Sequence, residues 1–337
     1  MPVEIGPFDP STASAADLAQ QYGVVTAVMT LDYPGQSVSS LEEHTELIRV
    51  PVTSLGPIRR WVARQDGRII GHASAICPEH ENRQLAIVRV IVAPTRWRQG
   101  IGTVLLRAIL PELGADGRSV VVGHSVKADA SGEAWARELG FVRTHAYVRQ
   151  RLRVADADPA RWQHPVAEGF RLERWTGAAP ESLLAEYARA RTAIADAPRG
   201  ESAMAFKDWT PARVRAHEAN LAARNCDNHV VVAVHEPSGE VAAVTELGIR
   251  VAQPTLGLQA DTAVVAGFRG RGLGLAVKGA MLRWLTADRP ALAEVFTQTA
   301  QDNVHMIRIN HAVGYATMSV HAELEAGTAE LAQRLAA

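Results

Sequence analysis

Apolar residues recur along this chain at two different spacings, and the change from one to the other predicts its elements. Residues 14–30 and 41–50 have the apolar spacing and flanking signals of two helices. Residues 58–65 and 68–76 have the pattern of strands and meet at Asp66-Gly67, a pair typical of hairpin turns. The pattern therefore predicts two helices followed by a hairpin.

The remaining elements of the first half also alternate between strand and helix. An apolar run at 86–94 predicts a strand, and a helical pattern follows Gly102 as far as Leu113. A buried strand is predicted at 119–125, a short helix at 131–139, and a strand pair or one long strand at 141–154.

The second half repeats this order. Strands are predicted at 170–175, 230–235, 240–250, 258–266, 293–299 and 315–323, and helices at 180–195, 211–224, 273–284 and 303–313. Between the halves, residues 155–167 are polar and contain prolines, which predicts a linker.

The two halves also share a motif in the same register. Gly100 and Gly102 are separated from Gly272 and Gly274 by one common offset, and the apolar positions of the helices that follow coincide at that offset. An internal repeat of this size indicates two copies of one fold.

The second copy of the motif, residues 268–274, joins a predicted strand to a predicted helix. Its three glycines allow a sharp turn and a close approach of the backbone to a ligand, while the helix directs free N–H groups into the turn. Arg269 and Arg271 add positive charge, so the loop is predicted to bind a phosphate or pyrophosphate.

Two common phosphate-binding motifs do not fit this loop. A dinucleotide fingerprint needs a third glycine where Val277 stands, and no clear acidic residue for the ribose follows. A nucleotide P-loop needs a lysine at the turn, whereas Lys278 lies inside the helix.

The remaining pattern, Arg-x-x-Gly-x-Gly between a strand and a helix, resembles the pyrophosphate loop of the GNAT superfamily of acyl-CoA N-acyltransferases. The repeat resembles a tandem GNAT protein. The resemblance implies an α/β fold (the α+β GNAT fold) with two domains, 1–154 and 168–337, around the linker 155–167. Each domain would have a mixed, partly splayed central sheet flanked by helices.

The resemblance also implies a set of cofactor-binding positions for acetyl-CoA or another acyl-CoA. In the second domain they are Val264, Val265 and Ala266 at the strand end, Arg269, Gly270, Arg271, Gly272, Leu273 and Gly274 in the loop, and Asn303 at the start of the helix across the gap. In the first domain they are Val92, Ala93, Arg98, Gly100 and Gly102.

Catalysis in this family requires an amine to lose a proton before it attacks the thioester. Many members carry a tyrosine that reprotonates the departing thiolate, but Ala136 and Asn310 stand at its two places here. Asp261 and Glu246 are the predicted bases. Because Trp97 replaces the leading Arg or Gln in the first copy, the second domain is predicted to perform the chemistry.

The acceptor is predicted to be a small-molecule amine bound beside the loop that holds Asp196, Arg199 and Glu201. Carboxylates there can hold an ammonium group, and the arginine can hold a carboxylate or phosphate. Two alternatives remain open from the sequence: a non-catalytic CoA-binding or acyl-CoA-binding protein, and an acyltransferase whose donor arrives on an acyl carrier protein.

Composition narrows the classes of protein, partner and location that are compatible with this sequence. The chain has 337 residues, 47% of them hydrophobic, and a formal net charge of -1, so two globular domains are expected and a nucleic-acid partner is not. No apolar run is long enough for a membrane span, and the N-terminus lacks a signal-peptide pattern, so a cytoplasmic location is predicted. The two cysteines and twelve histidines have no metal-ligand spacing, so no metal is expected.

Overall fold

The computed structural model describes residues 2–33, 38–50 and 55–336. They divide into two compact units that each combine separate stretches of the chain. Unit 1 consists of Met1–His145, Glu201–Ala205 and His321–Ala337, and unit 2 consists of Ala146–Gly200 and Phe206–Val320.

Unit 1 is built on a mixed sheet. Strands β1 (Glu4–Pro7), β2 (Ile58–Gln65), β3 (Arg68–Ile76), β4 (Leu85–Val92) and β5 (Val120–Lys127) follow one another in the sheet, and β12 (Ala316–Gly327) pairs with β5. Only β4 and β5 run parallel; the other neighbouring strands are antiparallel. The predicted hairpin at Asp66-Gly67 is confirmed, because β2 pairs with β3 across it.

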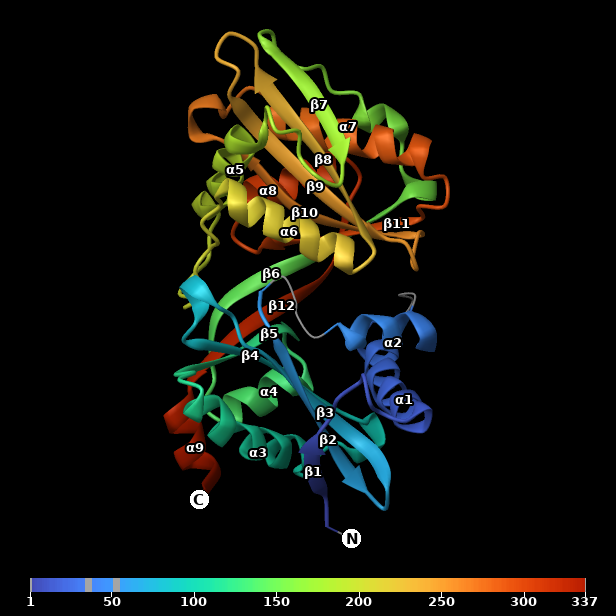
Figure 1. Cartoon of the computed structure of the whole chain (residues 1–337), viewed down its shortest axis with the longest axis vertical. Helices are drawn as coiled ribbons and strands as arrows, with labels where there is room; N and C mark the ends of the chain where they lie inside the picture. Colours follow the sequence, from blue (N-terminus) through green and yellow to red (C-terminus); the bar gives the residue numbers. More distant parts are fainter. Residues whose placement is uncertain (1, 34–37, 51–54, 337) are drawn as a thin grey trace. The chain divides into compact units, whose positions relative to one another are not determined.

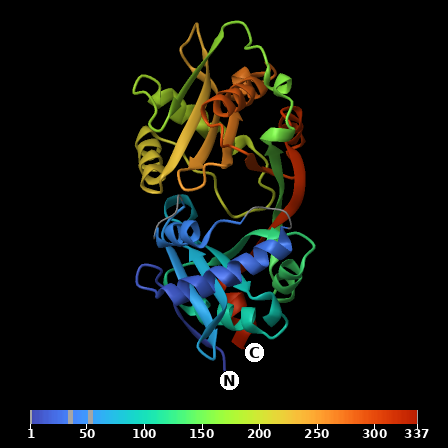
Figure 2. The same cartoon turned by 90° about the vertical axis from the view of Figure 1, so that its right-hand side faces the viewer.

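Helices cover both faces of this sheet (Figure 1). On one face, α1 (Ala15–Asp32) and α2 (Leu41–Arg49) bury a small apolar cluster with β2, β3 and β4. Figure 2 shows α1 lying across this face. On the other, α3 (Ile101–Ala115), α4 (Ser131–Glu138) and α9 (Thr328–Ala336) close the main core. The sheet therefore separates two apolar layers.

Unit 2 repeats the same plan. Its sheet has the order β7 (Phe170–Thr176), β8 (Cys226–His235), β9 (Val241–Arg250), β10 (Leu256–Val264), β11 (Glu294–Ala300) and β6 (Val142–Arg153), with β10 and β11 parallel. Helices α5 (Leu184–Thr192) and α6 (Pro211–Ala223) cover one face, while α7 (Leu273–Asp288) covers the other; α8 (Val304–Ala312) follows β11.

One strand of each sheet comes from the other half of the sequence. From Ala146 onward, β6 pairs with β11 in unit 2 although it follows the first copy of the fold. From His321 onward, β12 pairs with β5 in unit 1, and α9 then packs on α3. The red C-terminal strand and helix accordingly lie with the blue N-terminal part in Figure 1. The two units therefore differ from the contiguous ranges 1–154 and 168–337 expected from the sequence, because each unit includes residues from both ranges.

Residues 155–167, expected to be a linker, are packed against unit 2. Trp162 is 3% exposed, and its indole N–H donates to the Val313 carbonyl at 3.0 Å. The Trp162 carbonyl accepts a hydrogen bond from Arg283 on α7 and lies against Gly279, where a Cβ atom would be 2.4 Å from the carbonyl oxygen. A glycine on α7 is what allows this segment to approach so closely.

None of the helices formed by the described residues combines the length and the apolar character needed to span a bilayer.

Candidate active site

The parallel strands of unit 1 separate part of the way along their length. Their pairing covers Leu85–Ile87 on β4 and Val120–Val122 on β5, after which both strands continue without pairing to each other. At Ser125 the β5 backbone has a φ of 56°, and the register between β5 and β12 shifts nearby. This divergence leaves a gap between β4 and β5 within the sheet.

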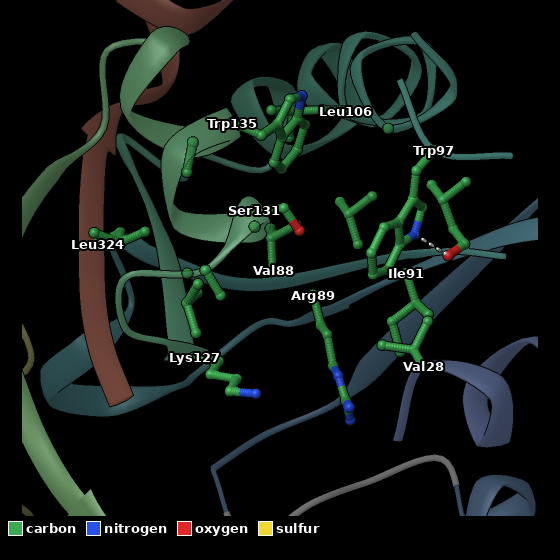
Figure 3. Close-up of a pocket in the computed structure, with 18 of the residues that line it drawn as sticks. Val28, Val88, Arg89, Ile91, Trp97, Leu106, Lys127, Ser131, Trp135 and Leu324 are labelled. Atoms are coloured by element: carbon green, nitrogen blue, oxygen red, sulfur yellow. Dashed lines mark hydrogen bonds between the residues drawn. The ribbon is translucent and has the colours of Figure 1, made fainter. Parts of the chain in front are cut away.

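A cavity of about 490 Å³ occupies the opening. That size is in the range of small-molecule sites, which is roughly 300–1,000 Å³. Figure 3 shows Trp135 and Leu106 on one side of it and Arg89 and Lys127 on the other. Its lining includes the ends of β4 and β5, the start of α3 and the last turn of α1.

The start of α3 has the geometry predicted for a pyrophosphate loop. Gly100 is the N-cap residue with φ 75° and ψ 0°, a left-handed conformation that favours glycine, and no side chain caps the helix. Gly102 lies under Trp135: a Cβ there would be 3.4 Å from the indole ring. Arg96, Arg98 and Thr103 line the same end of the cavity. The free N–H groups and positive charge suit an anion.

Trp97 fills the place of the expected Arg or Gln and makes an equivalent hydrogen bond. Its indole N–H donates to the Val92 carbonyl at 2.7 Å. In unit 2, the Nε atom of Arg269 donates to the Val264 carbonyl at 3.1 Å. Both bonds tie the loop to the end of the preceding strand, so the first loop retains this restraint despite the change of residue.

The loop of unit 2 has the same backbone conformation. Gly270 and Gly272 have φ of 78° and 74°, and Gly272 is the N-cap of α7. Leu273 is buried in the core, whereas Ala266 and Arg271 are exposed. A Cβ on Gly274 would lie 3.3 Å from Ile309 on α8. The predicted repeat of the glycine loop is thus confirmed in three dimensions.

The helix across the gap in unit 2 is fixed by polar contacts. Asn303 caps α8, its side-chain oxygen accepting from the Met306 N–H at 3.1 Å. Asn310, which stands where many GNAT proteins have a tyrosine, is fully buried and donates to Gln150 at 2.7 Å and Thr299 at 3.2 Å. In unit 1 the matching residue, Ala136, lines the cavity.

Glu246 and Asp261, the predicted bases, lie on neighbouring strands of unit 2. Glu246 is 1% exposed, its carboxylate lies 2.7 Å from Arg191, and Tyr187 donates to it at 2.8 Å. Burial raises the pKa of Glu246 to about 7, against the opposing effect of Arg191. Burial also raises the pKa of Asp261. Glu246 is therefore held in a closed ion pair.

At the cavity of unit 1, a histidine side chain contacts the carboxylate of a buried glutamate. His124 on β5 lines the cavity, and its Nδ1 atom lies 3.0 Å from the carboxylate of Glu323 on β12. Glu323 is completely buried, while the His124 side chain is 35% exposed. A carboxylate beside one ring nitrogen orients the imidazole.

Comparison with known proteins identifies the fold. Residues 27–141, which contain β4, the glycine loop and most of the cavity lining, match the model of the acetyltransferase (GNAT) family. A tandem GNAT protein from the clavulanic acid biosynthesis pathway superposes with a TM-score of 0.78 at 21% identity, covering 97% of this chain and 99% of its own. The chain therefore has the fold of tandem GNAT proteins, and residues 27–141 are similar to the acetyltransferase (GNAT) family. This fold and the acetyltransferase relatives indicate an N-acetyltransferase enzyme.

Two further relatives extend the comparison. Mycothiol acetyltransferase of Mycobacterium avium (strain 104) is 26% identical over 267 residues, covering 75% of this chain and 77% of its own. A GCN5-related N-acetyltransferase from Sphaerobacter thermophilus superposes with a TM-score of 0.70 at 15% identity, covering 97% of this chain and 96% of its own.

The residues predicted for the acceptor site have different surroundings in the structure. Asp196 forms an ion pair with Arg269, the leading residue of the unit 2 loop. Arg199 belongs to the same unit as Asp196, but Glu201 belongs to unit 1, where its backbone N–H donates to the Thr144 carbonyl at 2.9 Å. The three residues are thus divided between the two units by the path of the chain.

The sequence analysis missed the pair His124–Glu323 and the cavity cation Arg89. The two partners of the pair are 199 positions apart, and they meet only because β12 joins the sheet of unit 1. The only sequence signal was the predicted end of a strand at Ser125, beside His124.

Proposed function

We propose that this protein transfers an acetyl group, or another acyl group, from acyl-CoA to an amine of a small molecule. We propose further that the reaction takes place in the unit 1 cavity, by direct attack of the amine on the thioester. The observation that carries this proposal is the cavity itself, which opens between diverging strands next to a glycine loop at a helix N-terminus.

The lining of the cavity suits the donor along its length. The N–H groups at the start of α3, together with Arg96 and Arg98, would hold the pyrophosphate. The apolar side chains of Val90, Val92 and Trp135 would lie along the pantetheine arm. Backbone N–H groups of β4 beyond Ile87, where pairing with β5 has ended, would hold the thioester oxygen.

His124 is the proposed proton acceptor. An amine is mostly protonated at neutral pH and must lose one proton to become a nucleophile. His124 would accept that proton at the cavity, and the buried carboxylate of Glu323 would orient its ring. The amine nitrogen then bonds to the carbonyl carbon as the carbon–sulfur bond breaks. Its second proton passes to the departing thiolate.

The class of acceptor follows from the relatives. The Mycobacterium avium relative carries the name mycothiol acetyltransferase, and the cavity has the volume of a small-molecule site. The unit 2 positions Val264–Ala266 and Arg269–Gly274 remain a predicted second acyl-CoA site, and Glu246 and Asp261 remain its predicted bases.

Matched glycine variants test the location of the chemistry. Gly102→Val and Gly274→Val each crowd the start of one helix, since Gly102 lies against Trp135 and Gly274 against Ile309. We expect Gly102→Val to weaken acetyl-CoA binding in calorimetry by at least about tenfold, or ~1.4 kcal/mol, and to abolish CoA release with a panel of amines. Gly274→Val should leave that turnover in place.

The variant His124→Gln tests whether His124 is the proton acceptor. It should retain acetyl-CoA affinity and lose turnover, because it removes only the proton acceptor. Loss of turnover in Gly274→Val but not in Gly102→Val would return the chemistry to unit 2. Tight acetyl-CoA binding by the wild-type protein, with no CoA release from any amine, would indicate a binding protein instead. Unfolding midpoints of all variants exclude simple misfolding.

A further inference from the structure

The two faces of β4 differ in character within the unit 1 cavity. Val88 and Val90 belong to the apolar layer beneath α3. Ile91 belongs to the layer beneath α1, and Arg89, two residues earlier on the strand, faces the same way because strand side chains alternate. Figure 3 shows Arg89 and Lys127 on the side of the cavity away from Trp135 and Leu106.

Arg89 has no carboxylate within ion-pairing distance among the described residues. A guanidinium N–H of Arg89 donates to the Met29 sulfur at 3.8 Å. The Arg89 side chain is exposed to solvent within the cavity. An arginine so placed has a guanidinium fork available for a carboxylate or phosphate.

Lys127, at the end of β5, supplies a second cation on the same side. Its ammonium group donates to the backbone carbonyl of Asp32 at 2.7 Å and lies 5.9 Å from the centre of the Tyr33 ring. Both contacts hold the ammonium group without neutralising its charge. Two cations from neighbouring strands thus border the same part of the cavity.

The surrounding titratable groups leave this part of the cavity positively charged. Burial lowers the pKa of His72 on β3 and His44 on α2, and the cations Arg89 and Arg60 on β2 add to that effect. Of the carboxylates at the cavity, Glu323 is paired with His124, while Asp32 and Glu138 line the cavity and form no ion pair with Arg89 among the described residues.

We infer that the acceptor amine carries an anionic group, a carboxylate or a phosphate, and that Arg89 and Lys127 bind it. The role of the amine rests on the function proposed above; the anion site does not. His124 lies on β5 three residues before Lys127 and also lines the cavity. An acceptor whose anion is held by the two cations would therefore present its amine toward His124.

Direct anion binding tests the site without any turnover. Inorganic phosphate and acetate are titrated separately into the full-length protein, at constant ionic strength and with saturating CoA to occupy the glycine loop. We expect saturable binding of at least one anion, weakened about 10- to 100-fold by Arg89→Ala, as for a lost charge-assisted hydrogen bond. Arg89→Lys should weaken it less. Arg107→Ala, an exposed arginine on α3 outside the cavity, is the matched control.

Pairs of amine substrates then show whether the site prefers a carboxylate or a phosphate group. The pairs are 4-aminobutyrate with butylamine, and glucosamine 6-phosphate with glucosamine. The anionic member of one pair should have the higher kcat/KM, and Arg89→Ala should remove that preference while the KM for acetyl-CoA stays unchanged.

The outcomes distinguish this inference from the proposed function. If neither anion binds, or if Arg89→Ala and Arg107→Ala bind anions as the wild type does, the anion site is overturned. If anion binding depends on Arg89 but no amine releases CoA, the site stands and the proposed reaction fails.

Discussion

At the scale of single residues, two histidines are kept neutral by burial. His72 on β3 of unit 1 and His217 on α6 of unit 2 both have their pKa lowered to about 3, with burial as the main cause and nearby cations adding to it. In the unfolded chain a histidine titrates near pH 6.5. Each residue therefore links the stability of its unit to pH.

Stability should fall as the pH is lowered from about 6.5 toward 3. In that range the unfolded chain binds a proton at His72 that the native state does not, so unfolding becomes easier by up to about 1.4 kcal/mol per pH unit. His72→Gln, which cannot titrate, should show a shallower slope in urea unfolding measured at successive pH values. His305→Gln, an exposed histidine on α8, serves as the control. Equal slopes for the His72 variant and the wild type would contradict the prediction.

At the scale of elements, the turn between β4 and α3 includes a side-chain hydrogen bond to the strand end that different residues can supply. Trp97 in unit 1 and Arg269 in unit 2 both donate to the carbonyl at the end of the preceding strand. The donor matters more than the residue type, because the strand end would otherwise lose a partner worth about 1 kcal/mol. The presence of a tryptophan is thus compatible with a working loop.

The variant Trp97→Phe lacks the N–H group that donates to the Val92 carbonyl, whereas Trp97→Gln has a side-chain amide that can donate. We expect the phenylalanine variant to bind acetyl-CoA several-fold more weakly, since a loss of about 1 kcal/mol corresponds to roughly fivefold. The glutamine variant should retain more of the affinity although its side chain is smaller. Calorimetric titration of both variants makes the comparison. Wild-type affinity in Trp97→Phe would show that the hydrogen bond does not position the loop.

At the scale of the whole molecule, each compact unit depends on residues from the opposite half of the chain. Unit 1 takes Ala322 and Leu324 from β12 and Leu331 and Leu335 from α9 into its main core, all nearly inaccessible to solvent. Glu323, the partner of His124, arrives on the same strand. The last part of the sequence thus completes both the core and the candidate site of the first unit.

Truncation after Val320 should therefore unfold unit 1 and spare unit 2. The deletion removes four buried apolar side chains. Replacing a single buried leucine by alanine already lowers the free energy of unfolding by about 2–5 kcal/mol. Hydrogen exchange should show unprotected amides in β2–β5 and protected amides in β8–β10. Met318→Ala in the full-length chain, at a half-exposed position of β12, is the control. Native protection of β2–β5 in the truncated chain would contradict the dependence.

Much of the fold could be predicted from the sequence because its signals are local. Apolar periodicity gave β2, β3 and α6 within a residue of their ends, and the glycine spacing predicted the sharp turns in which Gly100 and Gly272 have positive φ. Such features depend on residues a few positions apart, which interact within one element. The short edge strand β1 was missed because four residues give no measurable period.

What the sequence by itself determined is the order of elements, the repeat and the glycine loops by which the chain resembles the tandem GNAT proteins. Only the tertiary structure decided which strand completes which sheet, which carboxylate is closed in an ion pair, and which cations share a cavity. The physical reason is the range of the interactions. Local conformation is encoded by neighbouring residues, whereas the pairs His124–Glu323 and Glu246–Arg191 form only when distant segments are packed together.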